Sequence, residues 1–155
     1  MKLLIRNRKS VEQIVKSTFS KGVAIISITD ANDTPVDLEY KPDFLLRLAF
    51  DDVDNDVFAD ESFDELTQEE RAGIEKRYNM FSEEQADEIA SFYEKNKDNI
   101  SVLFCQCEHG QSRSAAVAAA ILEIRNRRGI QIFADDRYYP NKVVFRKVLA
   151  ALKTK

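Results

Sequence analysis

One cysteine and one arginine in the second half of the chain have the spacing of a nucleophile that sits beside a bound anion. Five residues separate Cys107 from Arg113, and Gly110 stands midway between them. A glycine at the centre of a short loop lets the backbone curl until successive N–H groups converge on one anion. An arginine at the end of the loop can bind two oxygens of that anion. The segment therefore predicts a site for a tetrahedral dianion next to a thiol.

The thiol of Cys107 is expected to act there as a nucleophile. Helix N-termini and neighbouring cations favour the thiolate, which is the reactive form of cysteine. A thiolate beside a bound phosphoryl group is placed for in-line attack, which gives a cysteinyl-phosphate that water then hydrolyses. We expect no metal ion and no cofactor, because a single histidine and two cysteines are too few ligands for a zinc site.

The elements on either side of this loop are those that would position it. Residues 100–105 have the pattern of a buried strand, and residues 114–124 form an alanine-rich segment typical of a helix. Open α/β sheets bind ligands between the end of a strand and the start of a helix, because unpaired N–H groups and the helix dipole attract anions there. The order of elements thus supports an anion site at residues 107–113.

The rest of the chain predicts further strands and helices in alternation. Strands are expected at residues 3–5, 23–28 and 44–50, the last two as buried strands. Helices are expected to begin at a capping box at Ser10, at a second capping box at Ser82, and at Asn141 as an N-cap. This alternation predicts an α/β three-layer sandwich with a central, mainly parallel sheet of four to five strands flanked by helices.

The loop resembles the signature loop of the protein tyrosine phosphatase superfamily. The sequence CEHGQSRS at residues 107–114, with the alanine-rich helix after it, is similar to the dual-specificity branch of that superfamily. Residues 27–29 resemble an early strand of the family, and residues 139–149 resemble its closing Pro-Asn helix. The resemblance implies one dual-specificity phosphatase-like domain over residues 1–155, with an acidic insertion at about 53–81.

The resemblance also implies a general acid, which this family supplies as an aspartate after a mid-chain strand. The sequence LAFDD at residues 48–52 resembles that place and points to Asp52. Asp54 and Asp51 are the alternatives. An acidic loop residue that only contacts solvent is the competing interpretation for each of the three.

Ser114 has the position of a family hydroxyl that hydrogen-bonds the nucleophile and helps it to leave in the second step. Capping of the helix is its other possible role, and the two are compatible. The resemblance implies that the loop residues before Arg113 also line the phosphate site: Glu108, His109, Gly110, Gln111 and Ser112.

Two residues depart from the family pattern. Gln106 stands where the family usually has histidine before the nucleophile, and Glu108 places a carboxylate inside the loop. A carboxylate that pointed inward would repel a dianion, so we expect the Glu108 side chain at the rim. The neutral amide of Gln106 can hydrogen-bond the loop but supports a thiolate less well than histidine does.

Composition disfavours several classes of partner. The formal net charge is -4 and the sequence pI is about 5.2, whereas nucleic acids and anionic membrane surfaces attract basic proteins. The sequence shows no signal-peptide core and no stretch of membrane-spanning length, so we expect a cytoplasmic protein with reduced cysteines. We also expect it to be a monomer.

The leading hypothesis from the sequence is a metal-free cysteine-dependent phosphatase that acts on phosphorylated proteins or peptides. Phosphotyrosine is the first candidate substrate, followed by phosphoserine and phosphothreonine. A catalytically inactive phosphate-binding module is the main alternative, because Gln106 and Glu108 would both weaken the nucleophile. Sulfur or arsenate chemistry at Cys107 is a third hypothesis, since related loops serve those reactions.

Overall fold

The central layer of the molecule is a parallel β-sheet. The computed structural model describes residues 1–14, 20–54 and 65–155. Within these residues the strand order is β1-β4-β2-β3, and every neighbouring pair is parallel. The strands are β1 (Lys2–Asn7), β2 (Val23–Thr29), β3 (Phe44–Ala49) and β4 (Val102–Cys107).

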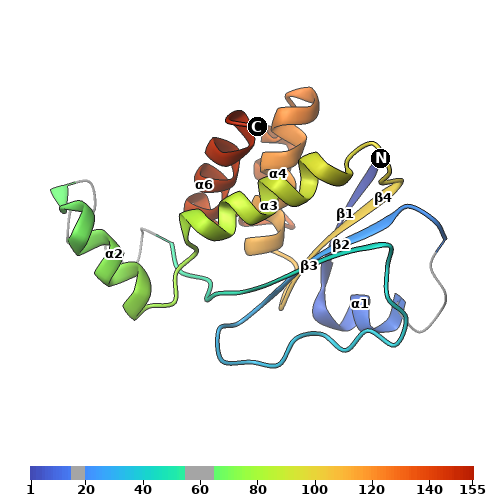
Figure 1. Ribbon diagram of the computed structural model, residues 1–155, viewed down its shortest axis with the longest axis horizontal. Coiled ribbons are helices and arrows are strands. Elements are labelled where there is room, and N and C mark those ends of the chain that lie inside the picture. Colours follow the sequence, from blue (N-terminus) through green and yellow to red (C-terminus); the bar gives the residue numbers. More distant parts are fainter. Residues whose placement is uncertain (15–19, 55–64) are drawn as a thin grey trace.

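Helices cover both faces of this sheet. Figure 1 shows α1 on one face and α3, α4 and α6 on the other, which confirms the predicted three-layer α/β fold. None of the helices in the described residues is long and apolar enough to cross a bilayer. Their bounds are α1 (Arg8–Ile14), α2 (Gln68–Arg77), α3 (Glu83–Asn96), α4 (Arg113–Asn126), α5 (Ile130–Phe133) and α6 (Lys142–Lys153).

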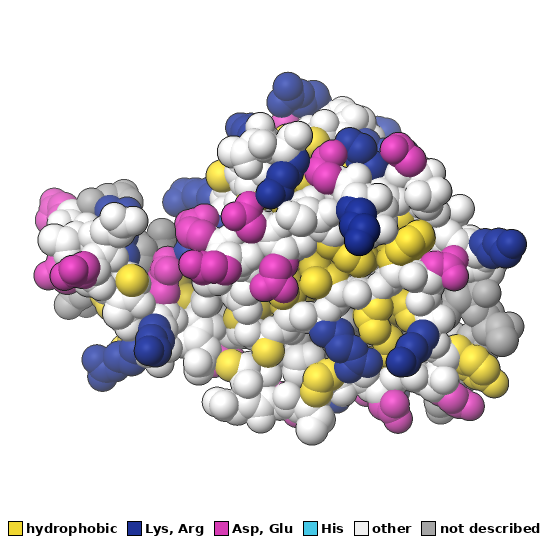
Figure 2. Space-filling view, viewed as in Figure 1, with side chains coloured by type: hydrophobic (Ala, Val, Ile, Leu, Met, Phe, Trp, Pro, Cys, Tyr) yellow, Lys and Arg dark blue, Asp and Glu magenta, His cyan; other side chains and the backbone are white. Residues whose placement is uncertain are grey.

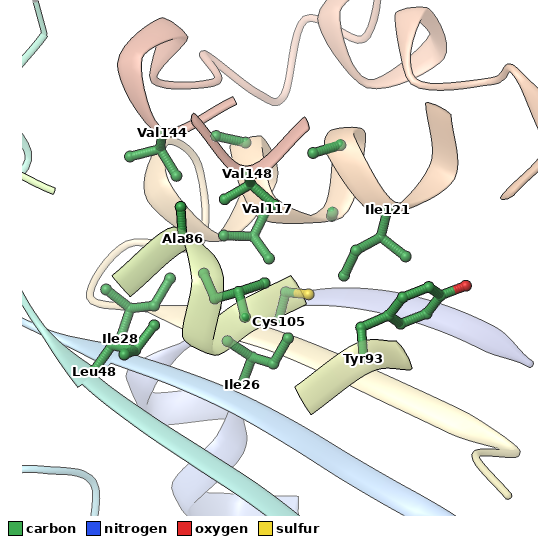
Figure 3. Packing of buried hydrophobic residues seen from close by; sticks show 14 of the residues in the cluster. Ile26, Ile28, Leu48, Ala86, Tyr93, Cys105, Val117, Ile121, Val144 and Val148 are labelled. Carbon is green, nitrogen blue, oxygen red and sulfur yellow. The ribbon is translucent and has the colours of Figure 1, made fainter. Parts of the chain in front are cut away.

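Two apolar clusters fix the sheet between the helical layers. All residues of β2 are buried, as predicted for a strand that is covered on both faces. Because side chains alternate along a strand, Ile26 and Cys105 pack against the layer of α3, α4 and α6 (Figure 3), whereas Ile25 and Phe104 belong to the cluster that contains Val11 of α1. The larger cluster lies between the sheet and α4, the helix that follows the predicted anion loop.

The caps of the two long helices beside α4 are confirmed. The Ser82 hydroxyl accepts the N–H of Gln85, and the Gln85 side chain accepts the N–H of Ser82, both at 3.1 Å. Asn141 accepts the N–H of Val144 at 3.0 Å at the start of α6. Each cap satisfies N–H groups that a helix cannot pair internally.

The predicted start of the first helix is wrong. α1 begins at Arg8, and the Asn7 side chain accepts the N–H of Ser10 at 2.8 Å. Asparagine caps helices as well as serine does, and Asn7 stands directly at the end of β1, so it starts the helix before the capping box at Ser10 can. Val15 and Phe19, which follow Val11 and Ile14 at helical spacing in the sequence, lie outside the described residues.

Two strands also differ from their predicted form. β3 is the edge strand of the sheet, and Leu48 is its single fully buried residue, so the prediction of a buried strand is wrong in part. β4 runs to Cys107 rather than ending at Cys105, because it stays paired with β1 until Asn7 lies opposite Cys107. The candidate nucleophile is therefore the last residue of a strand.

The predicted acidic insertion contains a helix that stands apart from the sheet. α2 has no buried residue, and it begins at a capping box between Thr67 and Glu70, a start that is not among the predicted helix starts. Figure 1 shows α2 away from the other helices, and in Figure 2 acidic side chains gather around it and over the first half of α3. Residues 55–64 of the insertion lie outside the described residues.

The central position of β2 predicts a stability difference between two isoleucines. Ile26 is 0% exposed in the larger cluster, whereas Ile130 is 69% exposed. Replacing Ile26 by alanine removes buried methyl groups and leaves a cavity, so it should lower the free energy of unfolding by about 2–5 kcal/mol. Ile130→Ala should change it by less than about 0.5 kcal/mol. Urea denaturation of both variants measures the difference, and equal stabilities would contradict this packing.

Candidate active site

The candidate nucleophile lies at the junction of β4 and α4. Cys107 ends β4, is 2% exposed, and has its Sγ 3.0 Å from the Oγ of Ser114 in the first turn of α4. The N-cap residue of α4 is Ser112, whose side chain makes no capping hydrogen bond. The positive end of the helix dipole is therefore uncapped where it meets the loop.

The loop between Cys107 and α4 turns its carbonyl groups toward the scaffold. The carbonyl of Glu108 accepts the N–H of Arg8 at 3.2 Å, and the carbonyl of Gln111 accepts the N–H of Tyr139 at 2.9 Å. By contrast, the backbone N–H groups of residues 108–113 donate to no other group within the described parts of the chain. Unpaired N–H groups in sequence make an anion-binding concavity.

Gly110 allows the loop to lie against the end of β1. Its φ is +66°, in the left-handed region that side chains rarely adopt. A Cβ atom added there would lie 2.7 Å from the carbonyl carbon of Arg6 and from the nitrogen of Asn7. The loop therefore needs glycine at this position for two reasons, its backbone angle and its contact with β1.

Arg113 is buried and held on two sides. Its Nη1 donates to the carbonyl of Phe50 at 2.6 Å, and its Nη2 pairs with Oδ1 of Asp30 at 2.6 Å. Its Nε is buried and has no hydrogen-bond partner among the residues that the structure describes. A buried N–H of a cation is costly to leave unpaired, which makes this atom a strong candidate for binding an anion.

Asp30 was missed in the sequence analysis. The residue follows β2 directly, and its carboxylate is the ion-pair partner of Arg113. The available signal was an acidic residue at the carboxyl end of a buried strand, the edge where parallel sheets gather functional groups. Assigning Asp30 to this site requires the pairing of β2 with β4, which the sequence does not reveal.

Of the three candidate acids, Asp52 is the one that bonds to the loop. Its Oδ1 accepts the hydroxyl of Ser112 at 2.8 Å and the side-chain amide of Asn141 at 2.9 Å. Asp51 instead accepts the N–H of Ala31 at 2.9 Å. Asp54 accepts the N–H of Lys142 at the start of α6 at 2.8 Å.

Four other side chains of the loop and its flank are directed to the rim, to solvent or into the core. The Glu108 carboxylate lies 3.7 Å from Nη1 of Arg8, as expected for a residue at the rim, and His109 and Gln111 are exposed. Gln106 is buried and does not bond to the loop. Its Oε1 accepts the hydroxyl of Ser27 in β2 at 2.7 Å.

Cys105 differs from Cys107 in its surroundings. It is fully buried among apolar side chains, and both cysteines are free thiols. Burial raises the pKa of the Cys105 thiol well above its usual range, and the neighbouring Cys107 raises it further. A buried thiol that keeps its proton is unreactive, so Cys105 has the properties of a packing residue.

A pocket of about 520 Å³ opens beside the loop. It contains both the candidate acid and the loop serine that bonds to it, and several aromatic rings form its wall. Its lining residues include Asp52, Ser112, Phe133, Tyr138, Tyr139 and Asn141. A larger pocket of about 740 Å³ lies between α2, α3 and α6, and none of the candidate site residues lines it.

The fold can be compared with those of known proteins. No protein-family model matches the sequence, and no curated protein does. Solved structures match over nearly the whole chain. Human DUSP28 is 17% identical with a TM-score of 0.51, covering 98% of this chain and 92% of its own.

Two further structures give similar values. Tk-PTP, solved in its active form, is 15% identical with a TM-score of 0.52, covering 100% of this chain and 93% of its own. PTPMT1, solved in complex with PI(5)P, is 11% identical with a TM-score of 0.52. The match covers 99% of this chain and 91% of PTPMT1. Likeness at such low identity establishes the architecture. The chain therefore has the fold of the dual-specificity phosphatase-like proteins of the protein tyrosine phosphatase superfamily.

Proposed function

We propose that this chain is a cysteine-dependent phosphatase that hydrolyses phosphomonoesters without a metal ion. The observation that most supports this function is the unpartnered, buried Nε of Arg113. It belongs to the residue that ends a loop of unpaired N–H groups, and that loop begins next to the sulfur of Cys107. A dianionic phosphoryl group would satisfy all of these donors at once.

In the first step the Cys107 thiolate attacks phosphorus. The S–P bond forms as the bond from phosphorus to the ester oxygen breaks, and Asp52 gives its proton to that leaving oxygen. The loop N–H groups and Arg113 stabilise charge on the three phosphoryl oxygens that do not react. The ion pair with Asp30 fixes Arg113 for this task.

In the second step water attacks the cysteinyl-phosphate. Asp52, now ionised, accepts a proton from that water, and the P–S bond breaks with its electron pair returning to sulfur. The Ser114 hydroxyl, 3.0 Å from Sγ, can donate a hydrogen bond to the departing thiolate. This role agrees with the complete burial of Ser114, whose hydroxyl faces the sulfur and not solvent.

The pocket beside the loop supports an aromatic leaving group. Asp52 must reach the leaving oxygen, so the leaving group must lie on its side of the loop, where Phe133, Tyr138 and Tyr139 line the pocket. Aromatic walls favour a phosphotyrosine ring over the short chain of phosphoserine or phosphothreonine. PTPMT1 was solved with a phosphoinositide, but a net charge of -4 disfavours work at an anionic membrane surface. Phosphotyrosine in proteins or peptides is the proposed substrate.

Replacing the nucleophile should abolish turnover. Cys107→Ser should lower kcat for a phosphotyrosine peptide by more than about 10³-fold, because serine does not ionise at neutral pH. Cys105→Ala is the matched control and should retain activity, since its thiol lies in the apolar core. Release of inorganic phosphate measures both variants.

The same measurement separates the phosphatase from an inactive phosphate-binding module. Folded wild-type protein that binds the phosphopeptide and releases no phosphate would support the inactive module and contradict the proposed reaction. Activity in Cys107→Ser equal to that of wild type would rule out this cysteine as the nucleophile.

Replacing the acid should change the pH profile. The wild-type rate should fall on the alkaline side, because Asp52 must be protonated to donate. Asp52→Asn cannot lose a proton in that way, so the alkaline fall should disappear, and kcat for phenyl phosphate should drop by about 10²–10⁴-fold. Asn can still accept from Ser112 and Asn141, which preserves the local contacts.

Asp54→Asn is the matched control for this acid. Its side chain accepts the N–H of Lys142, an interaction that the amide oxygen can keep. The variant should retain the alkaline fall of the wild type. If the alkaline fall of the pH profile persisted in Asp52→Asn and disappeared in Asp54→Asn, the role of acid would belong to Asp54.

A further inference from the structure

Tyr139 is an exposed aromatic residue with a fixed backbone beside the phosphate loop. It is 71% exposed, whereas Tyr40 and Tyr78 are 41% and 40% exposed. Its N–H donates to the carbonyl of Gln111 in the loop at 2.9 Å, and Pro140, which follows it, is buried. The backbone on both sides of Tyr139 is therefore held in place, and its ring meets water at the edge of the site.

Two further aromatic rings lie next to Tyr139. Phe133 of α5 packs edge-to-face on Phe145 of α6, with 4.9 Å between the ring centroids. Tyr138 packs against the larger apolar cluster. Both rings are thus supported by α6 and the core, while they line the pocket of about 520 Å³ together with Tyr139. Phe133, Tyr138 and Tyr139 together form an aromatic wall.

The pocket is larger than one phenol ring requires. Its volume of about 520 Å³ lies within the range of about 300–1,000 Å³ that is typical of sites for whole small-molecule ligands. Asp52 and Ser112 line one part of the pocket, and the aromatic wall lines another. A phosphotyrosine whose ester oxygen lies at Asp52 therefore leaves part of the wall uncovered. In a peptide, the residues on either side of the phosphotyrosine are the groups that reach this part.

Charged groups next to the aromatic wall are engaged by one another. The Arg137 guanidinium lies 5.3 Å from the centroid of the Tyr138 ring, and its Nε donates to both carboxylate oxygens of Asp135 at 2.9 and 3.1 Å. Asp54 accepts the N–H of Lys142 at 2.8 Å. Charges of both signs give neither an acidic nor a basic side chain an advantage here. An apolar side chain, by contrast, gains free energy when it leaves water to pack on aromatic rings.

We propose that the aromatic wall binds an apolar side chain directly next to the phosphotyrosine of a peptide substrate. This inference rests on the proposed phosphatase function, because the wall and the phosphate loop contact the same substrate. It adds the sequence context in which the phosphotyrosine is recognised. The contact is remote from the reacting bonds, so it strengthens binding of the substrate and of its transition state alike.

Two phosphotyrosine peptides that differ only beside the phosphotyrosine test this preference. One peptide carries leucine on both sides of it, and the other carries serine. We expect wild-type kcat/KM to be about tenfold higher for the leucine peptide, because burial of one apolar side chain changes binding by about that factor or more. The difference should lie in KM, with similar kcat for the two peptides. Release of inorganic phosphate measures both.

Tyr139→Ser should remove most of the preference. The variant keeps the backbone N–H to Gln111 and deletes the exposed ring, so the ratio of the two kcat/KM values should fall below about threefold. Tyr139→Phe keeps the ring and should keep the wild-type ratio. Tyr40→Ser is the matched control for loss of an exposed tyrosine, because Tyr40 precedes the amino end of β3, away from the loop, and it should also keep the ratio. Thermal denaturation verifies that each variant is folded.

Equal or lower kcat/KM of the wild type for the leucine peptide would overturn the proposal. A preference that survives in Tyr139→Ser, or that Tyr139→Phe also loses, would overturn it too, because the ring face would then not be the binding group. Each of these results leaves the proposed function standing as long as wild type hydrolyses phenyl phosphate and Cys107→Ser does not. Folded wild-type protein that hydrolyses neither phenyl phosphate nor the peptides would instead refute the proposed function, and the inference with it.

Discussion

The site depends on a loop whose carbonyl groups are bonded outward while its N–H groups are left unpaired. The carbonyls of Glu108, Gln111 and Ser112 accept backbone N–H groups, whereas the N–H groups of the same three residues have no partner within the described residues. A buried polar group without a partner costs about 1–3 kcal/mol, so the loop is stable when water or an anion occupies it. The uncapped start of α4 attracts negative charge to the same place. The backbone alone therefore offers donors that suit an anion, before any side chain contributes.

The parallel sheet explains why residues far apart in the sequence meet at this loop. Cys107 ends β4, Asp30 follows β2, and Asp52 comes shortly after β3, and these strands are neighbours in the sheet. Parallel strands bring their carboxyl ends to one edge, which is where α/β proteins bind ligands. Arg113 then connects two of these strand ends, because it pairs with Asp30 and donates to the carbonyl of Phe50 after β3. The sheet thus places Asp30, Phe50 and Arg113 at one edge, and the Arg113 guanidinium bonds to both of the other residues.

The features that the sequence predicted are local ones. The caps at Ser82 and Asn141 follow from residues within three positions, and the strand, loop and helix around the cysteine follow from one continuous segment. The bond from Asn141 to Asp52 spans 89 residues, so no local pattern contains it. Even a local pattern fails where two caps compete, as Ser10 did with Asn7. Sequence reasoning predicted which residues would carry the chemistry, whereas the contacts between them depend on the order of the strands in the sheet.

Gln106, which departs from the family pattern, supports the sheet, and its side chain makes no hydrogen bond with the candidate nucleophile. Successive side chains of a strand point to opposite faces, so Gln106 is directed away from the face of Cys107. Its amide bonds to Ser27 in β2, where both side chains are buried. A neutral amide on that face adds no charge near the sulfur and instead strengthens the contact between β4 and β2. The groups on the α4 side of the Cys107 sulfur are the start of the helix, Arg113 and the Ser114 hydroxyl, and in the proposed reaction these groups would stabilise a thiolate.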